Sequence, residues 1–327
     1  MKPTRYFPAS LASLACAFVC LCATMPKVCA AGSPKPLLPG ELKLERTEAA
    51  ASRSAAAWLG PPSLGESPII VKLRLEDGEE LPLKLDTGAA VTFLDESLAP
   101  KLGRRLGTTN SSAPFGQTAA LGIYSAPRLY AGDTPLLTGP RVYTVKNSPG
   151  RTDKGLLGMD CLRHYCIQFD FVAGKMTFLD PELLDPSELG TPFPLKSGHQ
   201  GITCFDGNLF SQGKMRFLLD TGWDGPFDGM VDPKVFKRLL QQYPTVGPPL
   251  YQTLPGGTAP GNIFANLNVS GQTYTGVRFS SGDLRALHVR GVIGMRFLGR
   301  HKVTLNFPRQ TLYLKYFSGA PLAEKGH

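Results

Sequence analysis

The amino-acid sequence predicts an all-β fold of two similar lobes, related by an internal duplication, with a few short helices. Glycine and proline are frequent, at 36 and 29 residues, and only 19% of residues are charged. Such a composition is typical of many short strands joined by turns. Short apolar runs alternate with polar residues at the period of a strand. One pattern occurs twice, which indicates duplication of a single unit.

The repeated pattern begins with a strand that leads into an Asp-Thr-Gly triplet. In the first half, alternating leucines over residues 81–85 precede Asp86-Thr87-Gly88. In the second half, apolar residues at the same offsets over residues 215–219 precede Asp220-Thr221-Gly222. Each aspartate is therefore expected just past the end of a half-buried strand.

The match between the two halves continues downstream of the triplets. The sequence Gly-Leu-Leu-Gly-Met at 155–159 corresponds to Gly-Val-Ile-Gly-Met at 291–295. The apolar positions that follow without a gap pair Leu162 with Leu298, Ile167 with Val303, Phe169 with Leu305, Phe171 with Phe307, Met176 with Leu312 and Phe178 with Leu314. Two Asp-capped tight turns would explain the triplets alone, but they would not explain this later match.

Short helices are expected after each triplet. Asp95 can cap a helix over 97–102, and Asp232 followed by Pro233 is a suitable start for another. We expect a signal peptide at 1–30, a linker or pro-segment at 31–66 with a helix over 41–59, a first lobe at 67–180, a linker at 181–190, a second lobe at 191–317 and a tail at 318–327.

The N-terminus has the features of an export signal. Lys2 and Arg5 precede an uncharged apolar stretch over 11–23, and cleavage is expected after Ala30. We therefore predict a periplasmic or extracellular protein without stable membrane insertion after cleavage; an uncleaved N-terminal anchor is the alternative. Three cysteines would remain, Cys161, Cys166 and Cys204, and without Cys-x-x-Cys spacing they are expected to be core residues. The formal charge is +9, but the basic residues are scattered, so we expect no nucleic-acid partner.

Two aspartates from the two halves can carry out hydrolysis without a metal or a cofactor. When two carboxyl groups lie close together they share one proton, because both cannot easily ionise. One can then act as a base toward water while the other acts as an acid. The glycine permits close approach of the backbone, and the threonine hydroxyl can hold the partner loop. The catalytic pair is therefore predicted to be Asp86 and Asp220, with no cofactor and no metal.

The segment Asp86-Thr87-Gly88-Ala89, with Gly158 downstream, resembles retropepsin-like aspartic peptidases, above all their bacterial secreted or periplasmic branch. The second half resembles the same unit through Asp220-Thr221-Gly222 and Gly294. The resemblance covers about residues 68–317 and implies an acid-protease-like, closed β-barrel fold of two lobes. It implies catalytic Asp86 and Asp220, supported by Thr87, Gly88, Ala89, Thr221, Gly222, Gly158 and Gly294. Trp223 departs from the small residue usual there and is interpreted either as a subsite residue or as a sign that the second lobe has decayed.

The resemblance also implies a peptide or unfolded protein as substrate, and a monomer in which both aspartates come from one chain. Hairpins at 111–122 and 255–262 are candidate flaps. Asp160, Asp170 and Asp228 are interpreted as caps or surface groups. One alternative is a non-catalytic member of the same fold that binds peptide or protein. Another is a homodimer in which Asp86 pairs with Asp86 of a second chain.

Motifs of other enzyme classes are missing from the sequence. The five histidines have no metal-ligand spacing, and neither a Gly-x-Ser-x-Gly elbow nor a phosphate-binding loop occurs. These observations argue against a metallohydrolase, a serine hydrolase and a nucleotide-binding enzyme.

Overall fold

The computed structural model describes residues 36–44, 68–112, 118–147, 151–209, 213–224, 226–242, 250–254 and 257–316. The predicted signal peptide, the predicted tail and most of the predicted linker lie outside these ranges. Within them, no helix is both long enough and apolar enough to span a membrane.

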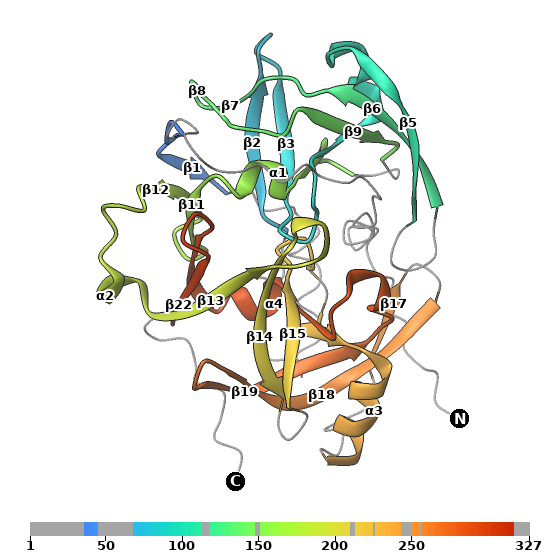
Figure 1. Cartoon of the computed structure of the whole chain (residues 1–327), viewed down its shortest axis with the longest axis vertical. Helices are drawn as coiled ribbons and strands as arrows, with labels where there is room; N and C mark the ends of the chain where they lie inside the picture. Colours follow the sequence, from blue (N-terminus) through green and yellow to red (C-terminus); the bar gives the residue numbers. More distant parts are fainter. Residues whose placement is uncertain are drawn as a thin grey trace.

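The described residues are mainly β-strands in two sheets, which confirms the predicted all-β class (Figure 1). The first sheet contains, in spatial order, β5 (Arg105–Ser112), β6 (Thr118–Ser125), β9 (Arg141–Val145), β4 (Phe93–Asp95), β10 (Gly155–Leu157), β3 (Glu80–Leu85), β2 (Ile70–Leu75), β7 (Leu129–Ala131) and β8 (Thr134–Pro135). It occupies the upper part of the view in Figure 1.

The second sheet joins strands from both halves of the chain. Its order is β1 (Glu41–Lys43), β12 (Lys175–Leu179), β11 (Cys166–Asp170), β21 (His301–Asn306), β22 (Thr311–Tyr316), β13 (Thr191–Ser197), β14 (Thr203–Leu209), β15 (Lys214–Leu219), β20 (Gly291–Ile293), β16 (Gly229–Val231), β19 (Gln272–Ser281), β18 (Gly257–Val269) and β17 (Leu250–Leu254). The strands β11 and β12 of the first half thus continue the sheet of the second half.

The two halves meet where β11 and β21 run antiparallel. Gln168 and Thr304 face each other in this register, and the Gln168 side-chain amide donates to the Thr304 hydroxyl at 2.9 Å. These two residues are 136 positions apart, the separation of the sequence match downstream of the triplets. The pairing is therefore centred on corresponding positions of the two halves, which is the arrangement that an approximate twofold axis requires.

The helices are short, and their starts follow from local capping. They are α1 (Met159–Leu162), α2 (Pro186–Leu189), α3 (Pro233–Gln242) and α4 (Met295–Leu298), with 3-10 turns η4 (Glu96–Lys101), η5 (His199–Gly201) and η6 (Arg285–Leu287). The Asp95 carboxylate accepts from the Ser97 amide at 3.0 Å, and Asp232 accepts from the amides of Lys234 and Val235 at 2.9 Å. The two predicted caps are confirmed, although the first caps a 3-10 turn.

The strand β1 corrects the first residues of the helix predicted over 41–59, and residues 45–59 lie outside the described ranges. Residues Glu41–Lys43 pair with β12 at the edge of the second sheet, and Leu42 packs partly buried against the core. Glu41 also forms an exposed ion pair with Lys175 at 2.9 Å. Because an open sheet edge offers unpaired backbone groups, pairing with it outweighs the local helix propensity of this segment.

Both candidate flap segments lie in antiparallel hairpins, β5 with β6 and β17 with β18. The hairpin tips at 113–117 and 255–256 are outside the described residues. The three cysteines, Cys161, Cys166 and Cys204, are buried and unpaired, as predicted for core residues.

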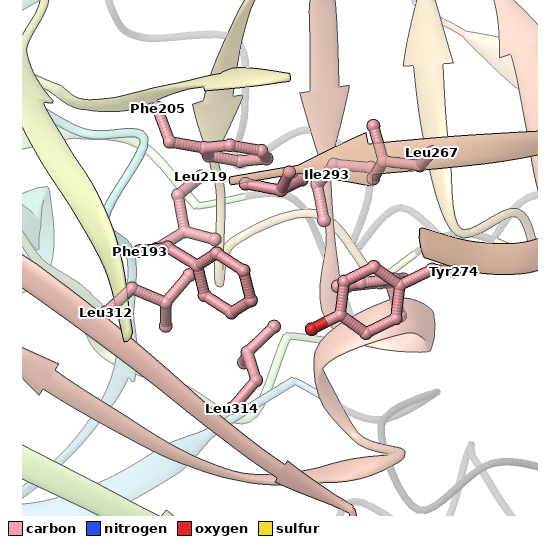
Figure 2. Close-up of a pocket in the computed structure, with 10 residues that line it drawn as sticks. Phe193, Phe205, Leu219, Leu267, Tyr274, Ile293, Leu312 and Leu314 are labelled. Atoms are coloured by element: carbon pink, nitrogen blue, oxygen red, sulfur yellow. The ribbon is translucent and has the colours of Figure 1, made fainter. Parts of the chain in front are cut away.

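The core of the second half contains a small apolar cavity of about 10 Å³ (Figure 2). Its lining includes Leu219 and Ile293, which lie at the ends of the parallel strands β15 and β20. Leu219 directly precedes Asp220, so the packing of this core holds the strand that ends at the second triplet.

Candidate active site

The two triplets follow corresponding strands and lie in the interior of the molecule. Asp86 follows β3, and its amide donates to the Leu157 carbonyl of β10 at 3.0 Å. Asp220 follows β15, and its amide donates to the Ile293 carbonyl of β20 at 2.9 Å. The exposed fractions of Asp86 and Asp220 are 0% and 1%. In each half, the strand that ends at the aspartate pairs in parallel with the short strand before α1 or α4. This pairing fixes the position of the aspartate at the end of its strand.

The glycine of each triplet allows the opposite carboxyl group to approach. The amides of Gly88 and Gly222 donate to Oδ1 of their own aspartates, each at 2.8 Å. A Cβ atom on Gly88 would lie 2.7 Å from Cγ of Asp220, and one on Gly222 would lie 2.4 Å from Cγ of Asp86. No side chain fits at such distances, so this close packing of the turns requires glycine at both positions.

The two threonines exchange hydrogen bonds across the interface between the halves. The Thr87 amide donates to the Thr221 hydroxyl at 3.1 Å, and the Thr221 amide donates to the Thr87 hydroxyl at 3.0 Å. Each hydroxyl donates onward into the opposite strand, Thr87 to the Leu219 carbonyl at 2.6 Å and Thr221 to the Leu85 carbonyl at 3.0 Å. All four bonds are buried, and they tie the two aspartate turns into one unit.

The electrostatics of the pair follow from burial and proximity. Burial raises the pKa of Asp86 well above its ordinary value of 3.8, and the neighbouring charge of Asp220 raises it further. The positive charge of Lys84 acts in the opposite direction and lowers the pKa of Asp86. Two buried carboxyl groups this close hold a shared proton more readily than two charges, which is the condition that acid-base chemistry at one water requires.

Gly158 and Gly294 lie behind the two turns at corresponding places. A Cβ atom on Gly158 would lie 2.3 Å from the Val91 carbonyl oxygen, and one on Gly294 would lie 2.3 Å from Cδ1 of Trp223. The next amides bind the turns directly, because Met159 donates to the Ala89 carbonyl and Met295 to the Trp223 carbonyl, each at 2.8 Å. The predicted support residues are thus placed around the two aspartates.

Trp223 is 3% exposed in this structure, and its indole packs in an apolar cluster with residues that include Ile202, Leu218 and Met230. The side chain therefore forms part of the packing beside the second triplet. Its role as a subsite residue stays a prediction.

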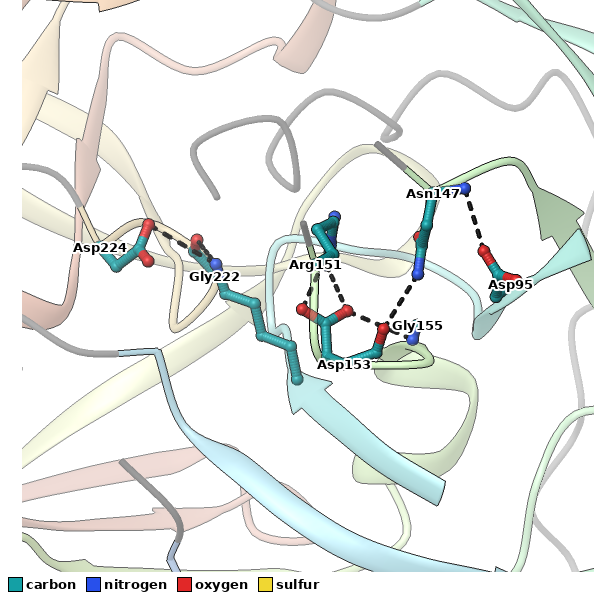
Figure 3. A network of polar contacts seen from close by, with 8 residues as sticks. Asp95, Asn147, Arg151, Asp153, Gly155, Gly222 and Asp224 are labelled. Carbon is teal, nitrogen blue, oxygen red and sulfur yellow. Dashed lines mark hydrogen bonds and ion pairs between the residues drawn. The ribbon is translucent and has the colours of Figure 1, made fainter. Parts of the chain in front are cut away.

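A buried ion pair beside the triplets was not predicted from the sequence. The Lys84 ammonium donates to the Gly222 carbonyl at 2.8 Å and lies 3.6 Å from Oδ1 of Asp224. Figure 3 labels the two partners, Gly222 and Asp224. A signal was present, because Lys84 interrupts the strand before the first triplet where the second half has Leu218. Its partner lies in the other half of the chain, so local patterns could not identify the pair.

Two of the three aspartates interpreted as caps or surface groups are instead buried. Asp160 accepts from the Thr92 hydroxyl at 2.8 Å, and that hydroxyl in turn accepts from the Gly158 amide at 3.2 Å. Asp228 pairs with Arg300 and accepts from the Arg278 amide at 2.8 Å. These carboxylates satisfy buried polar groups that only the tertiary structure brings to them. Asp170 accepts from the Ala173 amide at 2.8 Å and caps a turn as predicted.

Within the described ranges, no group of three His, Cys, Asp or Glu side chains gathers as metal ligands would. The expectation that the protein needs neither metal nor cofactor stays a prediction.

Comparison with solved structures places this architecture in the class of aspartic-protease-like folds. An aspartic proteinase from Irpex lacteus matches with a TM-score of 0.56 at 14% identity, over 86% of this chain and 98% of the other. The basic 7S globulin from soybean matches with a TM-score of 0.51 at 13% identity, over 87% of this chain and 96% of the other. No family model and no curated protein sequence matches the chain. The fold is thus shared by one protein named as a proteinase and one named as a globulin, and the activity must be argued from the site.

Proposed function

We propose that this chain is a retropepsin-like aspartic endopeptidase in which both lobes belong to one polypeptide. The observation that carries the proposal is the pair of buried aspartate turns joined by reciprocal threonine hydrogen bonds. Two turns with a purely structural role would not need each carboxyl group to pack against the glycine of the opposite triplet. They would not need a raised pKa at Asp86 either.

The chemistry assigned to the pair is direct attack of water on a peptide bond. The ionised aspartate takes a proton from water as the water oxygen bonds to the peptide carbonyl carbon. The protonated aspartate gives its proton to the carbonyl oxygen, which yields a tetrahedral diol. The diol collapses as the C–N bond breaks: the first aspartate gives the proton that it took from water to the departing nitrogen, and the second aspartate takes a proton from a diol hydroxyl, which becomes the new carboxyl carbonyl. Because the pair exchanges one proton, it returns to its starting state after each turnover.

The substrate proposed is a peptide or an unfolded protein segment in extended form. The hairpins β5/β6 and β17/β18 offer strand edges, and an extended chain binds such edges through its own backbone groups. Export to the periplasm or the cell exterior is part of the proposal. It would be checked by N-terminal sequencing of the secreted chain, which should begin after Ala30.

The test is cleavage of an unfolded protein by the purified mature chain from acidic to neutral pH, with Asp86→Asn and Asp220→Asn measured in parallel. Both variants should lose cleavage by at least about a thousandfold, because each carboxyl group has a separate role in the same step. Loss in Asp86→Asn alone would instead support a homodimeric site with a structural second half. A folded wild-type chain that cleaves nothing would refute the proposal in favour of a peptide-binding protein.

A further inference from the structure

Lys84 and Asp224 form a buried ion pair across the interface between the two halves. Lys84 lies on β3, two residues before Asp86, and Asp224 lies two residues after Gly222. Their exposed fractions are 1% and 2%. The Lys84 ammonium reaches the Gly222 carbonyl at 2.8 Å, which belongs to the second aspartate turn. A strand of the first lobe thus holds the turn of the second lobe.

Asp224 of the pair has Lys84 as its charged neighbour, whereas Lys84 also acts on Asp86. Among the residues that the structure describes, neither carboxylate oxygen of Asp224 has a hydrogen-bond partner. The Lys84 ammonium at 3.6 Å is therefore the charge that offsets it. Burying two charges is costly, so the pair by itself is no argument for a gain in stability.

Each member of the pair stands where the other half of the chain has an apolar residue. The triplets are related by a separation of 134 residues, as between Thr87 and Thr221. At that separation, Lys84 corresponds to Leu218, and Asp224 corresponds to Ala90. Two copies of the first lobe would bury two lysines without a carboxylate, so the pair matches one lobe to the other.

We propose that Lys84 and Asp224 are a positioning pair, which holds the second aspartate turn against the first lobe and sets the pH range in which the dyad carries one proton. This inference rests on the proposed function of Asp86 and Asp220. Among the described residues, the charged groups that act on Asp86 are Asp220 and Lys84 of β3, and Asp224 of the second turn faces Lys84. Lys84 favours the ionised form of Asp86, and Asp224 reduces this effect by partly neutralising the lysine.

The charge argument predicts opposite effects for two variants. In Asp224→Asn the lysine keeps its charge without a counter-ion, so the bell-shaped pH profile of cleavage should move to lower pH. In the double variant Lys84→Leu/Asp224→Ala, which repeats the residues of the other half, the cation is absent and the profile should move to higher pH. Each shift is expected to be about one pH unit. The exposed ion pair of Lys175 with Glu41 offers a matched control. Because it is exposed and does not contact the aspartate turns, Lys175→Leu should leave the pH profile unchanged.

The experiment measures kcat/KM against pH for these variants and, without substrate, the titration of aspartate carboxyl groups by carbon-13 NMR. Opposite shifts in both measurements would support the inference, and a merely structural pair would lower stability without moving either curve. If the double variant does not fold, Asp224→Asn alone decides: a shift to lower pH supports the inference and no shift overturns it. If the wild type does not cleave, the proposed function fails, and the carboxyl titration still tests the pair.

Discussion

Replacement of Thr221 by valine should destabilise the protein far more than an ordinary loss of one hydroxyl. Valine has nearly the same shape, so packing is retained while two buried bonds are lost: one from the Thr87 amide at 3.1 Å and one to the Leu85 carbonyl at 3.0 Å. Each buried group left without a partner costs about 1–3 kcal/mol. The expected decrease in the free energy of unfolding is therefore about 2–6 kcal/mol. Urea unfolding followed by circular dichroism would measure it.

Thr203 provides the control for this prediction. Among the described residues, its buried hydroxyl donates one weak hydrogen bond, to the sulfur of Met159 at 3.4 Å, so Thr203→Val should cost less than about 1 kcal/mol. Thr221→Ser should recover most of the stability, because the serine hydroxyl can form the same two bonds. If Thr221→Val and Thr203→Val lower the free energy of unfolding equally, the reciprocal bonds do not hold the two turns together.

Three further predictions concern the supports of the site and the response to acid. Gly158→Ala should lower the free energy of unfolding by about 1–3 kcal/mol in thermal unfolding, because its new methyl group would meet the Val91 carbonyl oxygen at 2.3 Å; an unchanged Tm would contradict this. Asp232→Ala should cost about 1 kcal/mol in urea, because α3 loses its cap; no change would mean that the cap is dispensable. Burial lowers the pKa of His301 from 6.5 to about 4. As the pH falls, the unfolded chain therefore protonates this imidazole at a higher pH than the folded chain does. Stability should thus fall by at most about 3 kcal/mol between pH 6.5 and 4, and a His301→Phe variant that shows the same fall would exclude His301 as its source.

The residues that sequence reasoning misjudged are polar groups whose partners lie far away in the chain. Asp228 is followed by a glycine and looked like a turn residue, but Arg300 neutralises it 72 positions later. Lys84 stands between the alternating leucines of a strand and was given no role, but it is enclosed by the second aspartate turn. In both cases the burial of a charge depends on a partner that no local periodicity identifies.

By itself, the sequence determined the features that short-range physical chemistry controls. Alternating leucines before Asp86 specify a half-buried strand, Asp95 and Asp232 specify where helices begin, and the duplicated triplets indicate two aspartates of equal standing. Only the tertiary structure decided how these parts meet. Asp86 reaches Asp220 because β11 pairs with β21 and the threonines exchange hydrogen bonds over 134 residues. Such contacts depend on sheet pairing and on the closure of long loops, which the local sequence pattern does not encode.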